Sequence, residues 1–260
     1  MDLGLVGKKA LITGGSKGIG FATAITLAKE GAKVAIVARN TAELETAAAE
    51  IREATGHEPV WISADVSIES EAKRAVTEAA DRLGGLDILV NNAGTSAARP
   101  FGEVGTDAWT ADLDLKLFGA VHFARAALSH MQAAGGGAIV NVTAVGGKTP
   151  SASSLPTSVS RAAGLALTKA MSKDLGSSNI RVNAVCIGLI RSAQIERMWQ
   201  AKASDQTWEE FARDPQHRIP LGRIGEAQEA ANVIAFLVSD AASYVTGTSV
   251  NIDGGTAAVL

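Results

Sequence analysis

The stretch Thr13-Gly14-Gly15-Ser16-Lys17-Gly18-Ile19-Gly20 decides the fold, because it lies between a short apolar run, residues 10–12, and an Ala- and Leu-rich helical segment. Glycines at 14, 18 and 20 permit a tight turn and a close approach of the backbone to a pyrophosphate. The N-terminus of the following helix would offer free N–H groups and a positive dipole end to that anion. A glycine-rich turn between a strand and a helix therefore predicts a dinucleotide site.

Short β-branched runs alternate with longer helix-period segments along the whole chain. Strands are expected at residues 10–12, 34–37, 60–62, 88–90, 138–142, 182–185 and 250–252, and helices at 21–30, 42–54, 70–83 and 106–134. Continuous apolar strands separated by helices imply a parallel sheet that is covered on both faces, with right-handed crossovers. We predict an α/β fold with a doubly wound parallel sheet of Rossmann type, in a single domain spanning residues 1–260.

The composition excludes several classes of protein. Of 260 residues, 47% are hydrophobic, 20% charged and 4% aromatic, with a formal net charge of −3. That balance is typical of a globular domain and not of a disordered or fibrous chain. No excess of basic residues is present to neutralise phosphates, so no nucleic-acid partner is expected. The four histidines show no ligand spacing, so we expect no metal site.

Cysteine content and hydropathy point to a compartment. Cys186 is the single cysteine, which excludes an intramolecular disulfide. The longest uncharged stretch, residues 131–147, contains five glycines and cannot form a membrane helix. The first residues lack the basic and apolar regions of a signal peptide. We expect a cytoplasmic protein that does not associate with a membrane.

The same glycine-rich turn resembles that of the short-chain dehydrogenase/reductase family, which has Thr-Gly-x-x-x-Gly-x-Gly at this point. The likeness continues through Asp65-Val66, Asn91-Asn92-Ala93-Gly94, Arg181-Val182-Asn183-Ala184-Val185, residues 220–225 and Asp253-Gly254-Gly255, and so covers residues 6–255. The resemblance implies an NAD(P)-dependent oxidoreductase whose Asp65-Val66 contacts the adenine. The cofactor-binding positions it implies are Gly14, Ser16, Lys17, Gly18, Ile19, Gly20, Arg39, Asn40, Asp65, Val66, Asn92, Ala93, Gly94, Arg161 and Gly188.

The end of the second expected strand bears on the choice of dinucleotide. A site that prefers NAD usually has an acidic residue there, which holds the 2′-hydroxyl of the ribose. This chain has Arg39-Asn40 instead, and Lys17 in the glycine turn adds a second cation. Both cations could face a 2′-phosphate, so NADP(H) is favoured over NAD(H). The alternative is that Lys17 and Arg39 are solvated surface cations.

Members of the family reduce a carbonyl with a Ser, a Tyr, a Lys and an Asn, and the resemblance places these four positions on Ala144, Thr157, Arg161 and Lys116. All four depart from the family pattern. A threonine hydroxyl is a far weaker acid than a phenol, and an arginine cannot relay a proton as a lysine does. The only tyrosine, Tyr244, lies elsewhere in the chain. We therefore expect the usual ketone-reducing mechanism to be unavailable.

Three functions remain open at this point. The protein could still transfer hydride with another proton donor, for which Lys116 and Ser158 are the candidates. It could instead perform non-redox chemistry, as a lyase, an isomerase or a hydratase. It could also bind nucleotide without turnover, as a sensor or an inactive subunit. The fold alone does not choose among them, because function depends on the site.

Lys116 and residues 190–220 carry the remaining expectations. An inward-pointing Lys116 beside Arg161 would form a site with two cations, suited to an anionic small-molecule substrate; alternatively Lys116 reaches solvent or pairs with Asp112 or Asp114. Residues 190–220 match the family's substrate lid, and their aromatic side chains either line an apolar pocket or pack the lid down. The resemblance also implies a homo-oligomer, a tetramer.

Overall fold

A single parallel sheet forms the centre of the computed structural model, which describes residues 2–260. Seven strands lie in the order β3-β2-β1-β4-β5-β6-β7. They are β1 (Lys9–Thr13), β2 (Lys33–Ala38), β3 (Val60–Ser63), β4 (Ile88–Asn91), β5 (Gly137–Ala144), β6 (Ile180–Ile187) and β7 (Ser249–Ile252). Each expected strand is present, and the prediction of a doubly wound parallel sheet is confirmed.

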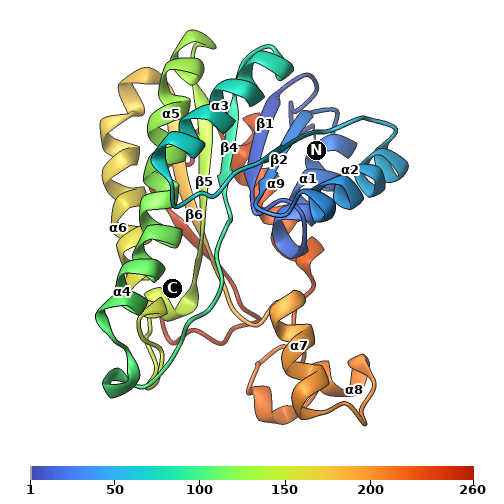
Figure 1. Cartoon of the computed structure of the whole chain (residues 1–260), viewed down its shortest axis with the longest axis vertical. Helices are drawn as coiled ribbons and strands as arrows, with labels where there is room; N and C mark the ends of the chain where they lie inside the picture. Colours follow the sequence, from blue (N-terminus) through green and yellow to red (C-terminus); the bar gives the residue numbers. More distant parts are fainter. Residues whose placement is uncertain (1) are drawn as a thin grey trace.

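Helices cover both faces of this sheet (Figure 1). One face packs against α1 (Gly18–Lys29), α2 (Thr41–Thr55) and α9 (Ala227–Val238). The other packs against α3 (Glu69–Leu83) and α5 (Gly119–Ala133), and α6 (Thr157–Asp174) lies beside α5 on that side. Among residues 2–260, no helix is long and apolar enough to cross a membrane.

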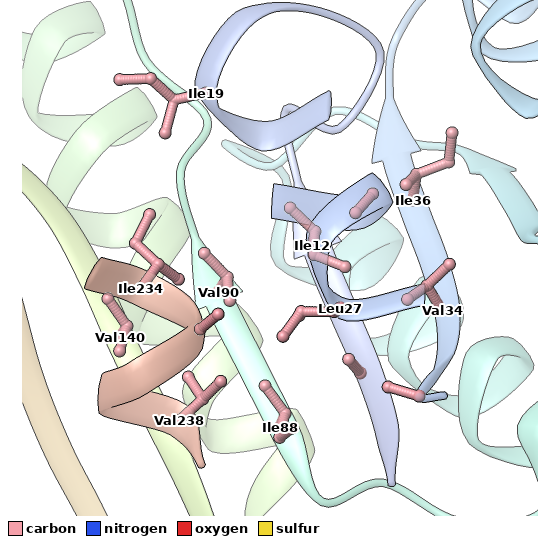
Figure 2. Close-up of a cluster of buried hydrophobic side chains, with 14 of the residues drawn as sticks. Ile12, Ile19, Leu27, Val34, Ile36, Ile88, Val90, Val140, Ile234 and Val238 are labelled. Carbon is pink, nitrogen blue, oxygen red and sulfur yellow. The ribbon is translucent and has the colours of Figure 1, made fainter. Parts of the chain in front are cut away.

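The alternation of side chains along the strands divides the core between the two faces. Ile12 belongs to the cluster under α1 and α9, whereas Leu11 belongs to the cluster under α3 and α5, and neither side chain is exposed. In Figure 2, Ile12 and Val90 of the sheet lie with Leu27 of α1 and Ile234 of α9. Full burial of one such side chain contributes about 1.5–3 kcal/mol. The β-branched runs therefore specify the sheet by having apolar side chains for both of its faces.

The long helix expected at residues 106–134 is present but contains an irregularity. It consists of α4 (Thr106–Leu113), a π-helical turn η2 (Asp114–Phe118) and α5. Asp112, Lys116 and Phe123 are buried, whereas Leu113 and Leu117 are only half-buried. The sequence pattern gave no sign of the π turn, and such turns occur frequently at functional sites.

Two short helices, α7 (Ala193–Lys202) and α8 (Trp208–Ala212), lie apart from the layers around the sheet (Figure 1). They have a small apolar cluster of their own, in which the ring of Trp208 lies 5.8 Å from that of Trp199 and 5.9 Å from that of Phe211. The guanidinium of Arg191 stacks 4.5 Å above Trp208. The aromatic residues of this segment thus pack against one another.

The order of the strands creates a crevice between β1 and β4. The chain runs from β1 outward to β3 and then returns to place β4 on the opposite side of β1. Ligands of doubly wound proteins bind at such a switch point, outside the carboxyl ends of the strands. Thr13 at the end of β1 joins the two sides, because its hydroxyl accepts hydrogen bonds from the N–H groups of Asn92 (3.0 Å) and Ala93 (3.1 Å).

Candidate functional site

A cleft of about 670 Å³ opens at this switch point. Its volume lies within the range of small-molecule and cofactor sites. Of the residues proposed from the sequence, those on its wall are Gly14, Ser16, Lys17, Gly18, Ile19, Arg39, Asn92, Ala93, Gly94, Ala144, Thr157, Arg161 and Gly188. Those not on its wall are Gly20, Asn40, Asp65, Val66, Lys116 and Ser158. The structure therefore brings most of the proposed residues to one cavity.

The glycine-rich turn forms one end of the cleft. Helix α1 begins at Gly18, its N-cap residue Lys17 makes no side-chain cap, and no acidic side chain occupies its first turn. Its first N–H groups are therefore available to an anion. A Cβ on Gly20 would lie 2.3 Å from the carbonyl oxygen of Gly14. The absence of a side chain at Gly20 therefore allows the turn to pack closely against the helix. This cradle fits the pyrophosphate of a dinucleotide.

Charged side chains meet beyond the glycine turn. The ammonium of Lys17 lies 2.8 Å from the carboxylate of Glu43, and Arg39 lies 3.9 Å from Asp65. Asn40 caps α2, since its side-chain oxygen accepts the N–H of Glu43 at 3.3 Å. Glu43 also lines the cleft. We did not identify it from the sequence, because only Lys17 in the glycine turn and the residues at the end of the second strand were considered.

A second, much smaller cavity lies behind the cleft. It has a volume of about 20 Å³, room for about one water molecule. Val66, Asn91, Lys116 and Arg161 are among the residues that line it. Val66 therefore lies beside the buried Lys116 and not on the wall of the main cleft.

Thr157 is the point at which this buried region meets the cleft. Its hydroxyl oxygen accepts hydrogen bonds from the ammonium of Lys116 at 3.0 Å and from the N–H of Ala97 at 2.9 Å. Lys116 also donates to Asp112, whose other carboxylate oxygen accepts the hydroxyl of Ser160 at 2.6 Å. Both acceptor positions of the Thr157 hydroxyl are thus engaged, and its own hydrogen is available to an acceptor in the cleft.

The structure combines two of the expectations for Lys116. The side chain points inward, with no exposed surface, and it pairs with Asp112. Burial lowers the pKa of Lys116, the hydrogen bond with Asp112 opposes that shift, and the charge of Arg161 adds to it. Because the ammonium is buried and already paired with a carboxylate, it does not offer a second free cation to a substrate.

Arg161 lies across the floor of the cleft. It donates from Nη1 to the carbonyl oxygen of Val142 at 2.7 Å. Its guanidinium also packs against Gly94, where an added Cβ would lie only 2.8 Å from Nη2. Burial lowers the pKa of Arg161 to about 10, against the opposing charge of Asp112. The side chain therefore remains cationic at neutral pH.

The other positions named from the sequence behave differently. Ala144 lines the cleft without a polar group, and the neighbouring Thr143 donates to the carbonyl oxygen of Val185 at 3.0 Å, away from the cleft wall. Ser158 is buried, and its hydroxyl bonds to that of Ser154 at 3.1 Å. Neither Thr143 nor Ser158 is placed to serve a ligand in the main cleft.

Residues at the start of the 190–220 segment form the far wall of the cleft. Ser192, Ala193, Gln194, Ile195 and Arg197 line it, whereas Trp199, Trp208 and Phe211 do not. The side-chain oxygen of Gln194 lies 3.1 Å from the N–H of Ser96 and 3.5 Å from the hydroxyl of Thr95, which join this segment to the chain after β4. Within residues 2–260, no group of three His, Cys, Asp or Glu side chains could hold a metal ion.

The parallel sheet, the crevice at its switch point and the glycine cradle define a Rossmann-like α/β protein. Residues 14–257 match the family model described as enoyl-(acyl carrier protein) reductase. The chain belongs to the short-chain dehydrogenase/reductase family of oxidoreductases, as the resemblance of its motifs predicted.

Three similar proteins bear on the site. The chain is 37% identical over 252 residues to a cis-4-hydroxycyclohexanecarboxylate dehydrogenase of Sinomonas cyclohexanicum, a match that covers 96% of both chains. L-Sorbose reductase of Gluconobacter frateurii, solved with NADPH and L-sorbose, superposes with a TM-score of 0.95 at 33% identity over the full length of both chains. An NADPH-bound short-chain oxidoreductase of Pseudomonas aeruginosa PAO1, described as containing an atypical catalytic centre, has a TM-score of 0.91 at 33% identity, covering 98% of this chain and 99% of its own.

Proposed function

We propose that this protein is an NADP(H)-dependent oxidoreductase that interconverts a carbonyl and an alcohol, and that its proton passes from Lys116 through Thr157. Family membership supports the reaction class. The observation that carries the proton route is the Thr157 hydroxyl, which lines the cleft and receives the Lys116 ammonium at 3.0 Å. Of the four substituted positions, Lys116, Thr157 and Arg161 then replace the family's usual set, Ala144 supplies no polar group, and Ser158 takes no part.

The proton route is a concerted relay along two hydrogen bonds, so that no threonine alkoxide forms. Bound NADPH would supply the hydride to the carbonyl carbon of the substrate. Thr157 donates its hydroxyl proton to the carbonyl oxygen, and Lys116 replaces that proton from its ammonium. The alcohol leaves with one hydride and one proton added, and Lys116 remains as a neutral amine beside Asp112. Because Lys116 is buried, it regains a proton from water in the emptied cleft through the Thr157 hydroxyl. A lysine whose pKa is lowered by burial is a better acid for this role than an exposed one.

The chain's own residues would hold the cofactor in three places. The free N–H groups at the start of α1 bind the pyrophosphate, and Arg161 donates to the hydroxyls of the nicotinamide ribose. Lys17 and Arg39 lie at the end of the cleft that would receive the 2′-phosphate of NADP(H). The NADPH complexes of the two solved relatives support the choice of NADP(H) over NAD(H).

The proposed substrate is a small ketone or secondary alcohol with further polar groups. Gln194 and Arg197 line the far wall of the cleft, and Arg161 lies on its floor. These side chains can donate hydrogen bonds to hydroxyl or carboxylate groups of a substrate. The names of the relatives, a hydroxycyclohexanecarboxylate dehydrogenase and an L-sorbose reductase, point in the same direction. An anionic substrate would be bound by the two arginines and not by Lys116.

One experiment separates this function from its rivals. NADPH binding is titrated by fluorescence, and a panel of ketones that includes 4-oxocyclohexanecarboxylate and L-sorbose is then screened by absorbance at the nicotinamide band. Wild type should bind and turn over, whereas Thr157→Val should bind normally and lose about 10²–10⁴-fold in kcat. Thr149→Val, outside the cleft wall, is the matched control. Binding without turnover favours the sensor or inactive subunit, and no binding favours non-redox chemistry.

We also propose a homotetramer and retain the cytoplasmic location as a prediction. Leu113 and Leu117 of the long helix are half-buried in the isolated chain, and Phe118 and Val159 are exposed. Exposed apolar side chains on α6 and on the turn η2, which contact each other, favour an interface between copies. Light scattering that gives the mass of a monomer would contradict the tetramer.

A further inference from the structure

We propose that Glu43 reduces the preference of this site for NADP(H) over NAD(H), because its carboxylate competes with the 2′-phosphate of NADP(H) for Lys17. The inference deepens the proposed function and rests on it, because it concerns how the same cleft distinguishes two nicotinamide cofactors. Glu43 lies on helix α2, outside the glycine-rich turn and outside the strand end from which the preference was first argued.

Three charged side chains from three elements meet at this end of the cleft. Lys17 precedes α1, Arg39 follows β2, and Glu43 lies in the first turn of α2; all three line the cleft. The Lys17 ammonium donates to Glu43 Oε1 at 2.8 Å, which is a short, charge-assisted hydrogen bond. Lys17 is therefore engaged before any phosphate arrives.

Arg39 is much less constrained than Lys17. Its side chain is 77% exposed, and its nearest carboxylate, that of Asp65, lies at 3.9 Å without a hydrogen bond between the two side chains. A 2′-phosphate can therefore pair with Arg39 at little cost. To pair with Lys17 as well, the phosphate must displace Glu43 or lie beside its carboxylate. Two negative charges in contact with the same ammonium repel each other, so this pairing is weakened.

The helix fixes the backbone of Glu43 and favours its negative charge. The Glu43 N–H donates to the N-capping Asn40 at 3.3 Å, and a negative side chain in the first turn of a helix is favoured by the helix dipole. A ribose 2′-hydroxyl, by contrast, is a donor that this carboxylate could accept. Glu43 therefore weakens the discrimination against NADH that Lys17 and Arg39 would otherwise produce.

The test compares the affinities for the two cofactors in variants of helix α2. Affinities of NADPH, NADH, 2′,5′-ADP and ADP are measured by calorimetry for wild type, Glu43→Gln and Glu45→Gln. Glu45 is an exposed residue of the same helix outside the cleft wall, so its variant makes the same charge change elsewhere. Glu43→Gln should increase the affinity for NADPH and 2′,5′-ADP about tenfold relative to the affinity for NADH and ADP. Glu45→Gln should leave this ratio of affinities unchanged.

A Lys17→Met background tests whether the effect passes through Lys17. If it does, adding Glu43→Gln in that background should change the ratio by much less than in wild type. An equal effect of Glu43→Gln on phosphorylated and unphosphorylated ligands would overturn this inference and leave the proposed function intact. Wild type that binds neither NADPH nor NADH would overturn the proposed function and this inference with it.

Discussion

The ammonium of Lys116 and the hydroxyl of Thr157, two residues 41 positions apart in the sequence, form a 3.0 Å hydrogen bond that joins two helical segments. Lys116 has no exposed side-chain surface, whereas Thr157 lines the cleft. The charge is therefore kept out of water, and only the hydroxyl faces a ligand. In this arrangement the acidic group and the group that contacts substrate are two different side chains, which is why Thr157 need not be a strong acid itself.

Asp112→Asn should move the pH dependence of carbonyl reduction. Reduction requires the protonated form of Lys116, so kcat falls as the pH rises through the pKa of Lys116. The Asp112 carboxylate raises that pKa against burial and against the charge of Arg161, and its removal should lower it further. The falling limb of kcat should therefore shift to lower pH, with KM for NADPH unchanged.

Two further variants control that measurement. Asp107→Asn, on the exposed first turn of α4, should leave the pH profile as in wild type. A buried lysine without its counterion destabilises a fold, by about 3–5 kcal/mol, so the double variant Asp112→Leu/Lys116→Met provides a folded form without the pair. A double variant that retains wild-type turnover would exclude Lys116 as the proton donor.

Gly94→Ala should disturb the cofactor site through Arg161. The added Cβ would lie 2.8 Å from Nη2, so the guanidinium must leave its place on the floor of the cleft. Hydrogen bonds from a charged group contribute about 1.5–3 kcal/mol, so NADPH binding should weaken about ten- to a hundredfold, as measured by fluorescence titration. Gly102→Ala, which meets no neighbouring atom within 4 Å, is the control. Equal affinities of both variants would show that Arg161 does not hold the ribose.

The sequence was sufficient for the sheet and the glycine cradle, because both depend on local patterns. β-Branched runs specify buried strands, and the spacing of Gly14, Gly18 and Gly20 specifies a turn that only those residues permit. Local motifs placed Gly14 and Ser16 to Ile19 on the cleft wall, whereas Ala144, Thr157, Arg161 and Gly188 were placed there by the resemblance to the family.

Contacts between distant segments could not be predicted in the same way. Glu43 lies 26 positions from Lys17 and Ser160 lies 48 from Asp112, so neither contact leaves a periodic signal in the sequence. The π-helical turn at Lys116 likewise has no pattern in the chain. The orientation of Trp199 and Trp208 depends on how the two short helices pack against each other, which composition alone does not decide.

Gln194→Ala should loosen the 190–220 segment over the cleft. It removes the acceptor of the Ser96 N–H, a contact between two segments 98 positions apart. A lost neutral hydrogen bond costs about 0.5–1.5 kcal/mol, so kcat/KM should fall about two- to tenfold and limited proteolysis within residues 190–220 should become faster. Gln200→Ala, exposed on the same helix, should change neither rate. If both variants are cleaved at the wild-type rate, the contact does not restrain this segment.

Glu229→Gln should reduce the acid sensitivity of folding. The two guanidinium hydrogen bonds from Arg223, at 2.7 and 2.8 Å, and the N–H of Glu226 lower the pKa of Glu229 to about 2. Because the folded-state pKa lies below the unfolded value, the stabilisation is present above that value, about 4.5, and is lost as the pH falls towards 2. The pair is partly exposed, so its contribution at neutral pH is about 0.5–1 kcal/mol. Urea unfolding should show the variant less stable than wild type at pH 7 and equal to it near pH 2, with Glu53→Gln indistinguishable from wild type throughout; a constant difference at all pH values would assign the effect to packing and not to charge.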